Sequence, residues 1–172
     1  GQRRDTTIAV LGTGIMGAPM AGHLIAAGNT VYLYTIEGVP AQLSDAGGKV
    51  VNSAAEVAQN ADIIFTMVPD TPHVESVLFG KGGVAEGFSA GKIVVDCVNP
   101  LGFEKQGPYV LAVEAGSAAQ EAQALLPGST VVAAFHHVSA ALLEDPVLDR
   151  LEGDVLVLGE DRDAVAVVCD LA

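Results

Sequence analysis

The clearest chemical pattern in the chain is a turn of three spaced glycines near its beginning, "GTGIMG". Gly12, Gly14 and Gly17 follow an apolar run and precede a segment compatible with a helix. The first glycine permits a tight turn, the second lets the backbone approach a pyrophosphate, and the third lets the helix pack on the strand. Free N–H groups at the start of the helix can then hold phosphate oxygens. The turn, with Thr13 and Ile15, therefore predicts a dinucleotide site, and a merely tight strand-to-helix turn is the alternative.

The end of the second apolar run bears on which nicotinamide cofactor binds. NAD enzymes usually carry an acid about 20 residues after the glycines, where it hydrogen-bonds the ribose 2′-OH. This run ends in Thr35 and Ile36 without an acid at its tip, and Glu37 comes after them. The missing acid removes a source of repulsion, and the Thr35 hydroxyl can donate to a 2′-phosphate. We therefore expect NADP as the cofactor, with NAD, which the surplus negative charge favours, as the alternative.

Apolar runs that alternate with helix-like segments must position this turn. The expected strands lie at residues 7–12, 30–35, 49–51, 62–68, 92–98, 129–135 and 154–159. Continuous apolar strands separated by helices indicate a parallel sheet covered on both faces. The expected fold class is therefore α/β, a doubly wound parallel sheet of about seven strands in a Rossmann-like NAD(P)-binding domain. Residues 1–172 are expected to form one such domain.

Three local patterns complete this outline. Ser53 followed by Glu56 is a capping box that predicts the start of a helix. The stretch "TPHVESVLFG" predicts a helix with Pro72 in its first turn. Residues 99–113, rich in proline and glycine, predict a long irregular loop after a strand's carboxyl end, where such loops are often functional.

The charge balance limits the partners of the protein. The 172 residues carry 8 Lys and Arg against 21 Asp and Glu, a net charge of −13. Such a chain repels nucleic acid and anionic membranes, so the expected partners are small-molecule cofactors. No apolar run is as long as a membrane-spanning helix, no signal peptide is recognisable, and Cys97 and Cys169 lack metal spacing. We therefore expect a soluble, cytoplasmic protein without a metal site.

The first half of the chain resembles a known enzyme family. The motif "VLGTGIMGAPM" is similar to the N-terminal signature of the β-hydroxyacid dehydrogenases, and "DIIFTMVPDTPHVESVLFG" closely resembles tartronate semialdehyde reductases (2-hydroxy-3-oxopropionate reductases). The resemblance covers about residues 7–96 and implies that Met16, Val68, Pro69 and Asp70 line the cofactor site. The serine loop, Gly-Gly motif, catalytic lysine and helical second domain of that family have no counterpart here, and "DCVNPLG" stands in place of the serine loop.

The second half resembles a different family. The motifs "VNPLG", "FHHVS" and "DVLVLGEDRDA" are similar to F-420-dependent NADP oxidoreductases, which pass hydride between NADP and an 8-hydroxy-5-deazaflavin. This resemblance runs from about residue 91 to residue 172. The change of resemblance predicts a recombination seam near residues 91–97, in an engineered or recombined chimera, with a natural divergent member as the alternative. That family continues beyond "CDLA" into a segment that helps to form the deazaflavin site and the dimer.

In both families hydride passes directly between the nicotinamide ring and an acceptor, so the protein needs to position two molecules and exclude water. We expect Pro69, Asn99 and Pro100 to flank the nicotinamide, with Asn99 bonded to its carboxamide. His136 and His137 end the sixth expected strand and are the candidate catalytic residues. The alternative is that one histidine caps the following helical turn and the other is packed.

The resemblances together imply hydride transfer between NADP(H) and deazaflavin coenzyme F-420, with an activity impaired by the missing C-terminal segment. One alternative is a recombined scaffold that folds and binds a dinucleotide without turnover. A second alternative is an NAD(P)-dependent reductase of tartronate semialdehyde.

Overall fold

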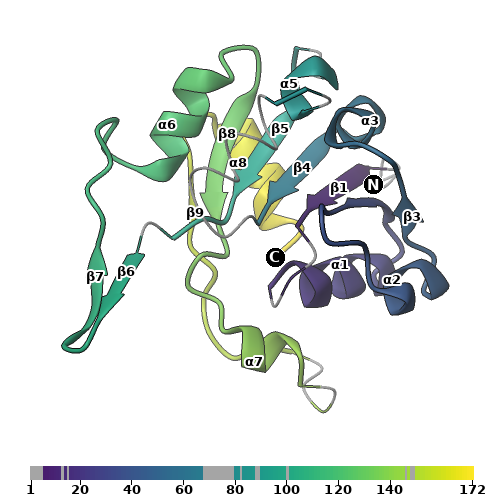
Figure 1. Ribbon diagram of the computed structural model, residues 1–172, viewed down its shortest axis with the longest axis horizontal. Helices are drawn as coiled ribbons and strands as arrows, with labels where there is room; N and C mark the ends of the chain where they lie inside the picture. Colours follow the sequence, from purple (N-terminus) through teal and green to yellow (C-terminus); the bar gives the residue numbers. More distant parts are fainter. Residues whose placement is uncertain are drawn as a thin grey trace.

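Helices and strands alternate along the computed structural model, which describes residues 6–12, 14, 16–67, 80–81, 83–87, 90–99, 101–145, 147 and 150–172 (Figure 1). The strands of the main sheet are β1 (Thr7–Leu11), β2 (Thr30–Tyr34), β3 (Lys49–Val50), β4 (Ile63–Thr66), β5 (Ile93–Asp96), β8 (Thr130–Ala134) and β9 (Val157–Leu158). The helices are α1 (Gly17–Ala26), α2 (Ala41–Asp45), α3 (Ala54–Asn60), α5 (Val84–Gly87), α6 (Ala118–Leu125), α7 (Ala140–Leu143) and α8 (Arg162–Cys169).

The main sheet has the strand order β3-β2-β1-β4-β5-β8-β9. The chain winds outward from β1 to β3 and then returns to place β4 on the other side of β1, so a crevice opens at the carboxyl ends of β1 and β4. This arrangement confirms the α/β Rossmann-like fold and all seven expected strands. One detail differs, because β9 pairs with β8 antiparallel. The chain turns back after α7 instead of crossing over, so the last strand closes the sheet in the opposite direction.

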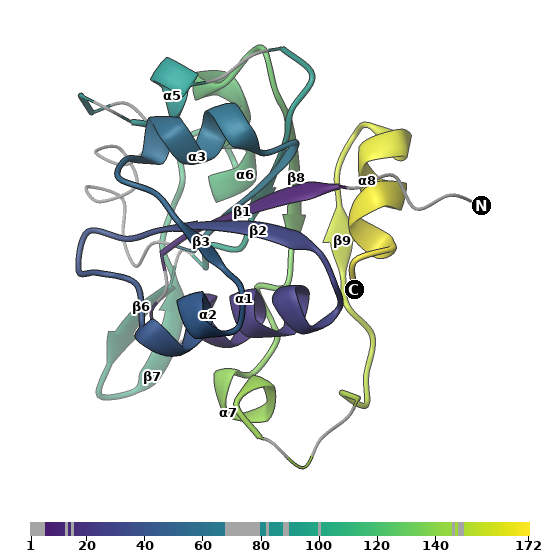
Figure 2. The same cartoon turned by 90° about the vertical axis from the view of Figure 1, so that its right-hand side faces the viewer.

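Both faces of the sheet are buried under helices, as the continuous apolar strands predict. Ile8, Val10 and Phe65 point to the face covered by α1 and α8, whereas Ala9 and Ile64 point to the face covered by α3. Figure 2 shows α1 and α2 on one side of the sheet and α3, α5 and α6 on the other. This two-sided core fixes the carboxyl ends of the central strands relative to one another.

Helix α3 is secured at both ends. At its start, the Ser53 hydroxyl accepts a hydrogen bond from the Glu56 N–H at 3.1 Å, which confirms the predicted cap. The Glu56 carboxylate accepts from the N–H of Asn52, one residue before the cap, at 3.0 Å. Near its end, the buried Lys92 ammonium donates to the carbonyls of Ala58 and Ala61. These bonds satisfy backbone groups that a helix end leaves without intrahelical partners.

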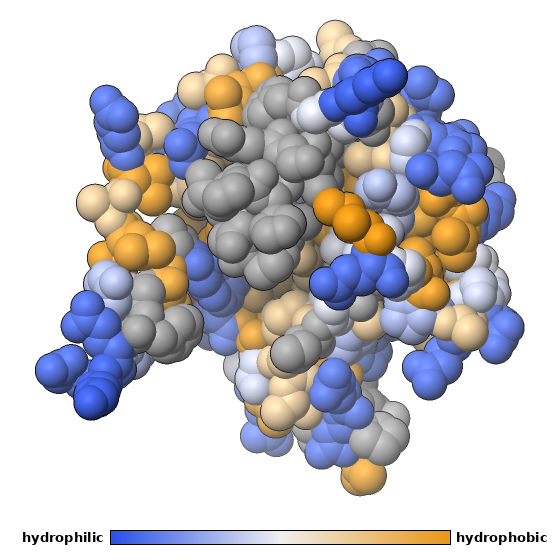
Figure 3. Space-filling view, viewed as in Figure 1, coloured by the Kyte–Doolittle hydropathy of each residue, from blue (hydrophilic) through white to orange (hydrophobic). Residues whose placement is uncertain are grey.

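The prediction of an irregular loop at residues 99–113 is wrong for most of that stretch. The chain instead forms an antiparallel hairpin of β6 (Leu101–Glu104) and β7 (Gly107–Val110), a second sheet of two strands. Gly107 closes the turn with φ +120°, a conformation that glycine adopts at little cost. Figure 1 shows the hairpin projecting from the main sheet, and in Figure 3 its far end is hydrophilic. The glycine and proline that suggested irregularity serve a tight turn and an edge strand.

Two further expectations concern helices. The predicted helix over "TPHVESVLFG" falls almost wholly outside the described residues. None of the helices in the described part of the chain combines the length and apolar character that a bilayer crossing needs.

Candidate dinucleotide-binding site

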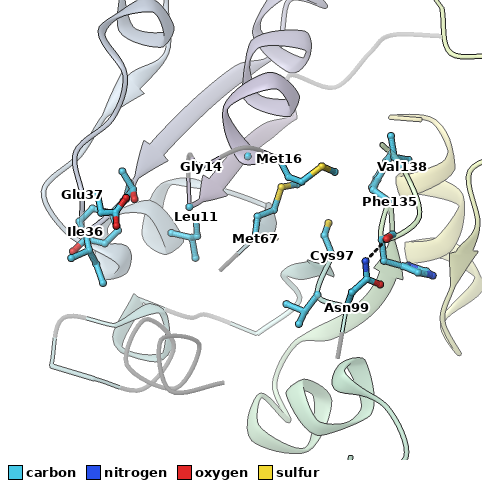
Figure 4. Close-up of a pocket in the computed structure, with 16 residues that line it drawn as sticks. Leu11, Gly14, Met16, Ile36, Glu37, Met67, Cys97, Asn99, Phe135 and Val138 are labelled. Carbon is cyan, nitrogen blue, oxygen red and sulfur yellow. Dashed lines mark hydrogen bonds between the residues drawn. The ribbon is translucent and has the colours of Figure 1, made fainter. Parts of the chain in front are cut away.

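A cavity of about 670 Å³ lies at the carboxyl ends of the parallel strands. Its wall includes the glycine turn after β1, Thr35–Glu37 after β2, Met67 after β4, Cys97–Asn99 after β5, and Phe135 and His136 after β8. In Figure 4 the side chains of Met16, Met67 and Cys97 lie between the glycine turn and the loop after β8. One continuous cavity thus joins residues that are far apart in the sequence. This is the crevice in which doubly wound domains bind ligands.

The three glycines of the turn differ in the space around them. Gly12 has φ +89°, and its N–H donates to the Tyr34 carbonyl at 3.0 Å. A Cβ atom on Gly17 would lie 1.7 Å from the Gly12 carbonyl oxygen, so α1 can pack this closely only with glycine there. A Cβ atom on Gly14 would meet nothing within 4 Å. Gly14 therefore faces open space in the cavity, where a phosphate group can approach its backbone. Thr13 and Ile15 lie outside the described residues.

The β2 end of the cavity is lined by Thr35, Ile36 and Glu37. In doubly wound domains, residues after the second strand face the adenosine ribose. Glu37 lies beyond the tip of β2 in the sequence, and the turn after β2 places it in the cavity wall. No arginine or lysine lines this cavity among the described residues. The ribose end therefore offers a hydroxyl and a carboxylate.

The opposite end of the cavity is built by the loops after β5 and β8. The Asn99 side-chain amide donates to the main-chain carbonyl of His136 and joins these two loops (Figure 4). Asn99 and His136 line the cavity, together with Cys97 and Phe135, which the sequence reasoning did not select as site residues. The expected contacts at Val68, Pro69, Asp70 and Pro100 lie outside the described residues.

The two candidate histidines do not act as a pair in the cavity. His136 lines it, whereas the His137 ring lies 2.8 Å from the Asp154 carbonyl and 3.4 Å from the Leu156 N–H. His137 thus holds the segment that returns toward β9. The two rings meet edge to face with centroids 5.4 Å apart.

Phe135 directly follows β8 and changes the direction of the chain there. Its φ of +62° lies in the left-handed region, which is uncommon for a residue with a large side chain. Its ring packs against Phe65 with centroids 5.8 Å apart, and only 9% of the residue is exposed. Strained backbone of this kind persists where the surrounding packing enforces it, often at functional sites.

Two titratable groups follow one another at the end of β5. Asp96 is 6% exposed, and burial raises its pKa from the ordinary 3.8 to about 6, although a hydrogen bond from the Val98 N–H opposes this. Burial, with the neighbouring Asp96 charge, also raises the pKa of the Cys97 thiol. The thiol therefore stays protonated near neutral pH and is a poor nucleophile. Within the described part of the chain, no group of three His, Cys, Asp or Glu side chains could hold a metal ion.

Residues 7–104 match the family model of the NAD binding domain of 6-phosphogluconate dehydrogenase. The chain belongs to this family of NAD-binding domains. It is an NAD(P)-binding domain with homologues among the β-hydroxyacid dehydrogenases. The cavity beside the glycine turn is the candidate place for the dinucleotide.

Curated relatives confirm the resemblance of the first half to β-hydroxyacid dehydrogenases. The chain is 45% identical to 2-hydroxy-3-oxopropionate reductase of Escherichia coli K12 over 89 residues, which are 52% of this chain and 30% of that protein. It is 34% identical to 2-(hydroxymethyl)glutarate dehydrogenase of Eubacterium barkeri over 182 aligned positions, gaps included, and the alignment covers 98% of this chain and 59% of that protein. The matched region thus spans from under a third to about three fifths of these relatives. The predicted seam at residues 91–97 stays a prediction.

Solved structures resemble the whole domain. A protein from Arthrobacter sp. FB24, provisionally named an F420-dependent NADP reductase, superposes with a TM-score of 0.73 at 30% identity. The match covers 95% of this chain and 78% of that one. An imine reductase from Bacillus cereus superposes with a TM-score of 0.72 over 96% of this chain and 52% of that one, and at 19% identity it shares the fold.

Proposed function

We propose that this domain holds NAD(P)H so that its nicotinamide exchanges hydride directly with a deazaflavin of the F-420 type. The observation that carries the proposal is the continuous cavity from the glycine turn to Asn99 and His136. The turn suits the pyrophosphate and the residues after β2 suit the adenosine ribose, so the nicotinamide reaches the end near β5 and β8. The similarity to the Arthrobacter protein, which extends over both halves of the chain, supports deazaflavin as the acceptor.

The character of the nicotinamide end fits direct hydride transfer. Met16, Met67 and Phe135 supply apolar surface that excludes water, and the protonated Cys97 thiol offers no nucleophile. Hydride transfer needs two rings held in contact, because the cofactor itself supplies the reactive bond. His136 and Asn99 are polar side chains at this end that can hydrogen-bond the nicotinamide or the acceptor.

The cofactor preference rests on the β2 end of the cavity. The Thr35 hydroxyl supports NADP, which the sequence led us to expect. Glu37 supports NAD, since a carboxylate accepts a hydrogen bond from a ribose 2′-OH and repels a 2′-phosphate. No cation among the described lining residues offsets this repulsion. We therefore favour NAD(H) over NADP(H) as the better ligand.

Reduction of a small semialdehyde is the second candidate function. The 45% identity with the Escherichia coli reductase favours it, although that match covers only 30% of the relative. No lysine lines the cavity among the described residues, so the proton donor that a carbonyl reduction needs would have to be His136 or lie elsewhere.

Titration calorimetry with NADH and with NADPH at fixed ionic strength tests the proposal. We expect dissociation constants on the order of micromolar, lower for NADH. Turnover is then followed by NAD(P)H absorbance with a deazaflavin and, separately, with tartronate semialdehyde. Deazaflavin turnover supports the first function and semialdehyde turnover the second. Binding without either turnover identifies a dinucleotide-binding scaffold, and absence of binding refutes the proposal.

A further inference from the structure

Asp96 is a buried acid that the proposed hydride transfer does not use. It ends β5 between β4 and β8, in register with Thr66 on one side and Ala133 on the other. Among the described residues, its carboxylate accepts a hydrogen bond from the Val98 N–H at 3.3 Å. No cationic side chain pairs with it among the described residues. An ionised carboxylate in such a place lacks compensation for the water it has lost.

The residues that follow Asp96 form the nicotinamide end of the cavity. Cys97, Val98 and Asn99 all line it. Asp96 ends β5 and so immediately precedes this wall in the chain, although it does not line the cavity itself. The oxidised ring carries a positive charge and the reduced ring does not. A buried carboxylate at the end of β5 is weakly screened by water, so its charge interacts differently with the two redox states of the ring.

We propose that Asp96 biases the cavity toward the oxidised cofactor, because its carboxylate compensates the positive charge of the oxidised nicotinamide ring. This inference rests on the proposed function, since it requires the ring to bind beside Cys97–Asn99. Asp96 does not contact the reacting atoms in this arrangement. It is a positioning residue that acts through the local field, and its effect is a ratio of two affinities.

The groups that face Asp96 allow its contribution to be isolated. Thr66 and Ala133 on the neighbouring strands carry no charge, and the Cys97 thiol is protonated near neutral pH. His136 is the other titratable group that lines this end of the cavity in the described structure. Because the pKa of Asp96 is about 6, its charge appears between about pH 5 and pH 7. The preference for the oxidised cofactor should therefore grow over this range.

The test is calorimetric titration of the full chain with the oxidised and reduced forms of one cofactor from about pH 5 to about pH 7.5. We expect the ratio of the two dissociation constants to shift by roughly threefold to tenfold toward the oxidised form as pH rises. Asp96→Asn should make the ratio independent of pH, whereas His136→Gln should retain the dependence. Glu160→Gln, which removes an exposed acid far along the chain, is the charge-matched control.

Several outcomes would overturn the inference. The first is a ratio of the two dissociation constants that does not change with pH in the native protein. The second is a pH dependence of this ratio that persists in Asp96→Asn. The third is a pH dependence that disappears only in His136→Gln. Carboxyl NMR of the native protein gives a second measurement that needs no variant: the oxidised cofactor should lower the pKa of Asp96 more than the reduced cofactor does, and equal effects overturn the inference. Binding with an unchanged ratio refutes this inference alone, whereas no binding of either form refutes the proposed function as well.

Discussion

The Asn99 side-chain amide donates a hydrogen bond to the main-chain carbonyl of His136 and so ties the loop after β5 to the loop after β8. Asn99→Ala should weaken cofactor binding by roughly threefold to tenfold and lower the free energy of unfolding by about 1 kcal/mol. His136→Ala keeps the accepting carbonyl, so it should leave this part of the stability unchanged. Calorimetry and denaturant unfolding measure both effects. Equal stability losses in the two variants would contradict this role for Asn99.

Gly14 and Gly17 provide a pair of variants that separate binding from folding. Gly17→Ala places a Cβ atom 1.7 Å from the Gly12 carbonyl oxygen, so α1 must move and stability should fall by at least about 3 kcal/mol. Gly14→Ala meets no protein atom within 4 Å and should fold normally. Its methyl group nevertheless occupies the space where a pyrophosphate approaches, so affinity should fall more than tenfold. If a folded Gly14→Ala protein bound the cofactor with native affinity, the pyrophosphate could not lie against this turn.

Glu37 should set the preference between the two cofactors. Glu37→Gln removes the carboxylate while keeping the size of the side chain. We expect the NADPH to NADH affinity ratio to rise by roughly threefold to tenfold, because a 2′-phosphate no longer meets a negative charge. Glu152→Gln, at another exposed acid, controls for the change in net charge. An equal shift in both variants would mean that the overall field, and not the cavity wall, decides the preference.

The stability of the protein should depend on Asp96 in a pH window below neutrality. Its pKa is raised from 3.8 to about 6 on folding, so the folded protein holds this proton more tightly than the unfolded chain does. The contribution of Asp96 to the free energy of unfolding therefore falls as pH rises from about 4 to about 6 and is level above that. Asp96→Asn should raise stability at pH 7 by roughly 1 to 3 kcal/mol and have little effect near pH 4. Unfolding curves of both proteins across this range give the difference directly, and a larger gain at pH 4 would reverse the assigned sign.

Lys92 should stabilise the end of α3. Lys92→Met leaves the carbonyls of Ala58 and Ala61 without their donor in a buried place, so we expect a loss of about 1 to 3 kcal/mol. Lys49→Met is the matched control, since the exposed Lys49 ammonium lies over the Tyr32 ring at 5.4 Å and should contribute less than about 1 kcal/mol. Thermal unfolding compares the two, and similar losses would show that Lys92 is not acting as a helix cap.

Several parts of this protein depend on local pattern and could be predicted before the fold was known. The glycine turn, the Ser53 cap and the seven apolar strands were predictable because turn chemistry, capping and hydrophobic periodicity act over a few residues. The doubly wound fold followed, since continuous apolar strands between helices leave few arrangements that bury both faces of a sheet.

Contacts between residues far apart in the sequence depend on the tertiary fold. The antiparallel direction of β9, the hairpin of β6 and β7, and the separation of His136 from His137 depend on how the chain returns after each strand. Glu37 and Cys97 join the cavity wall because strands distant in sequence end at one edge of the sheet. Asp96 gains its raised pKa from burial between β4 and β8, and burial is a property of the packed molecule that no local sequence pattern encodes.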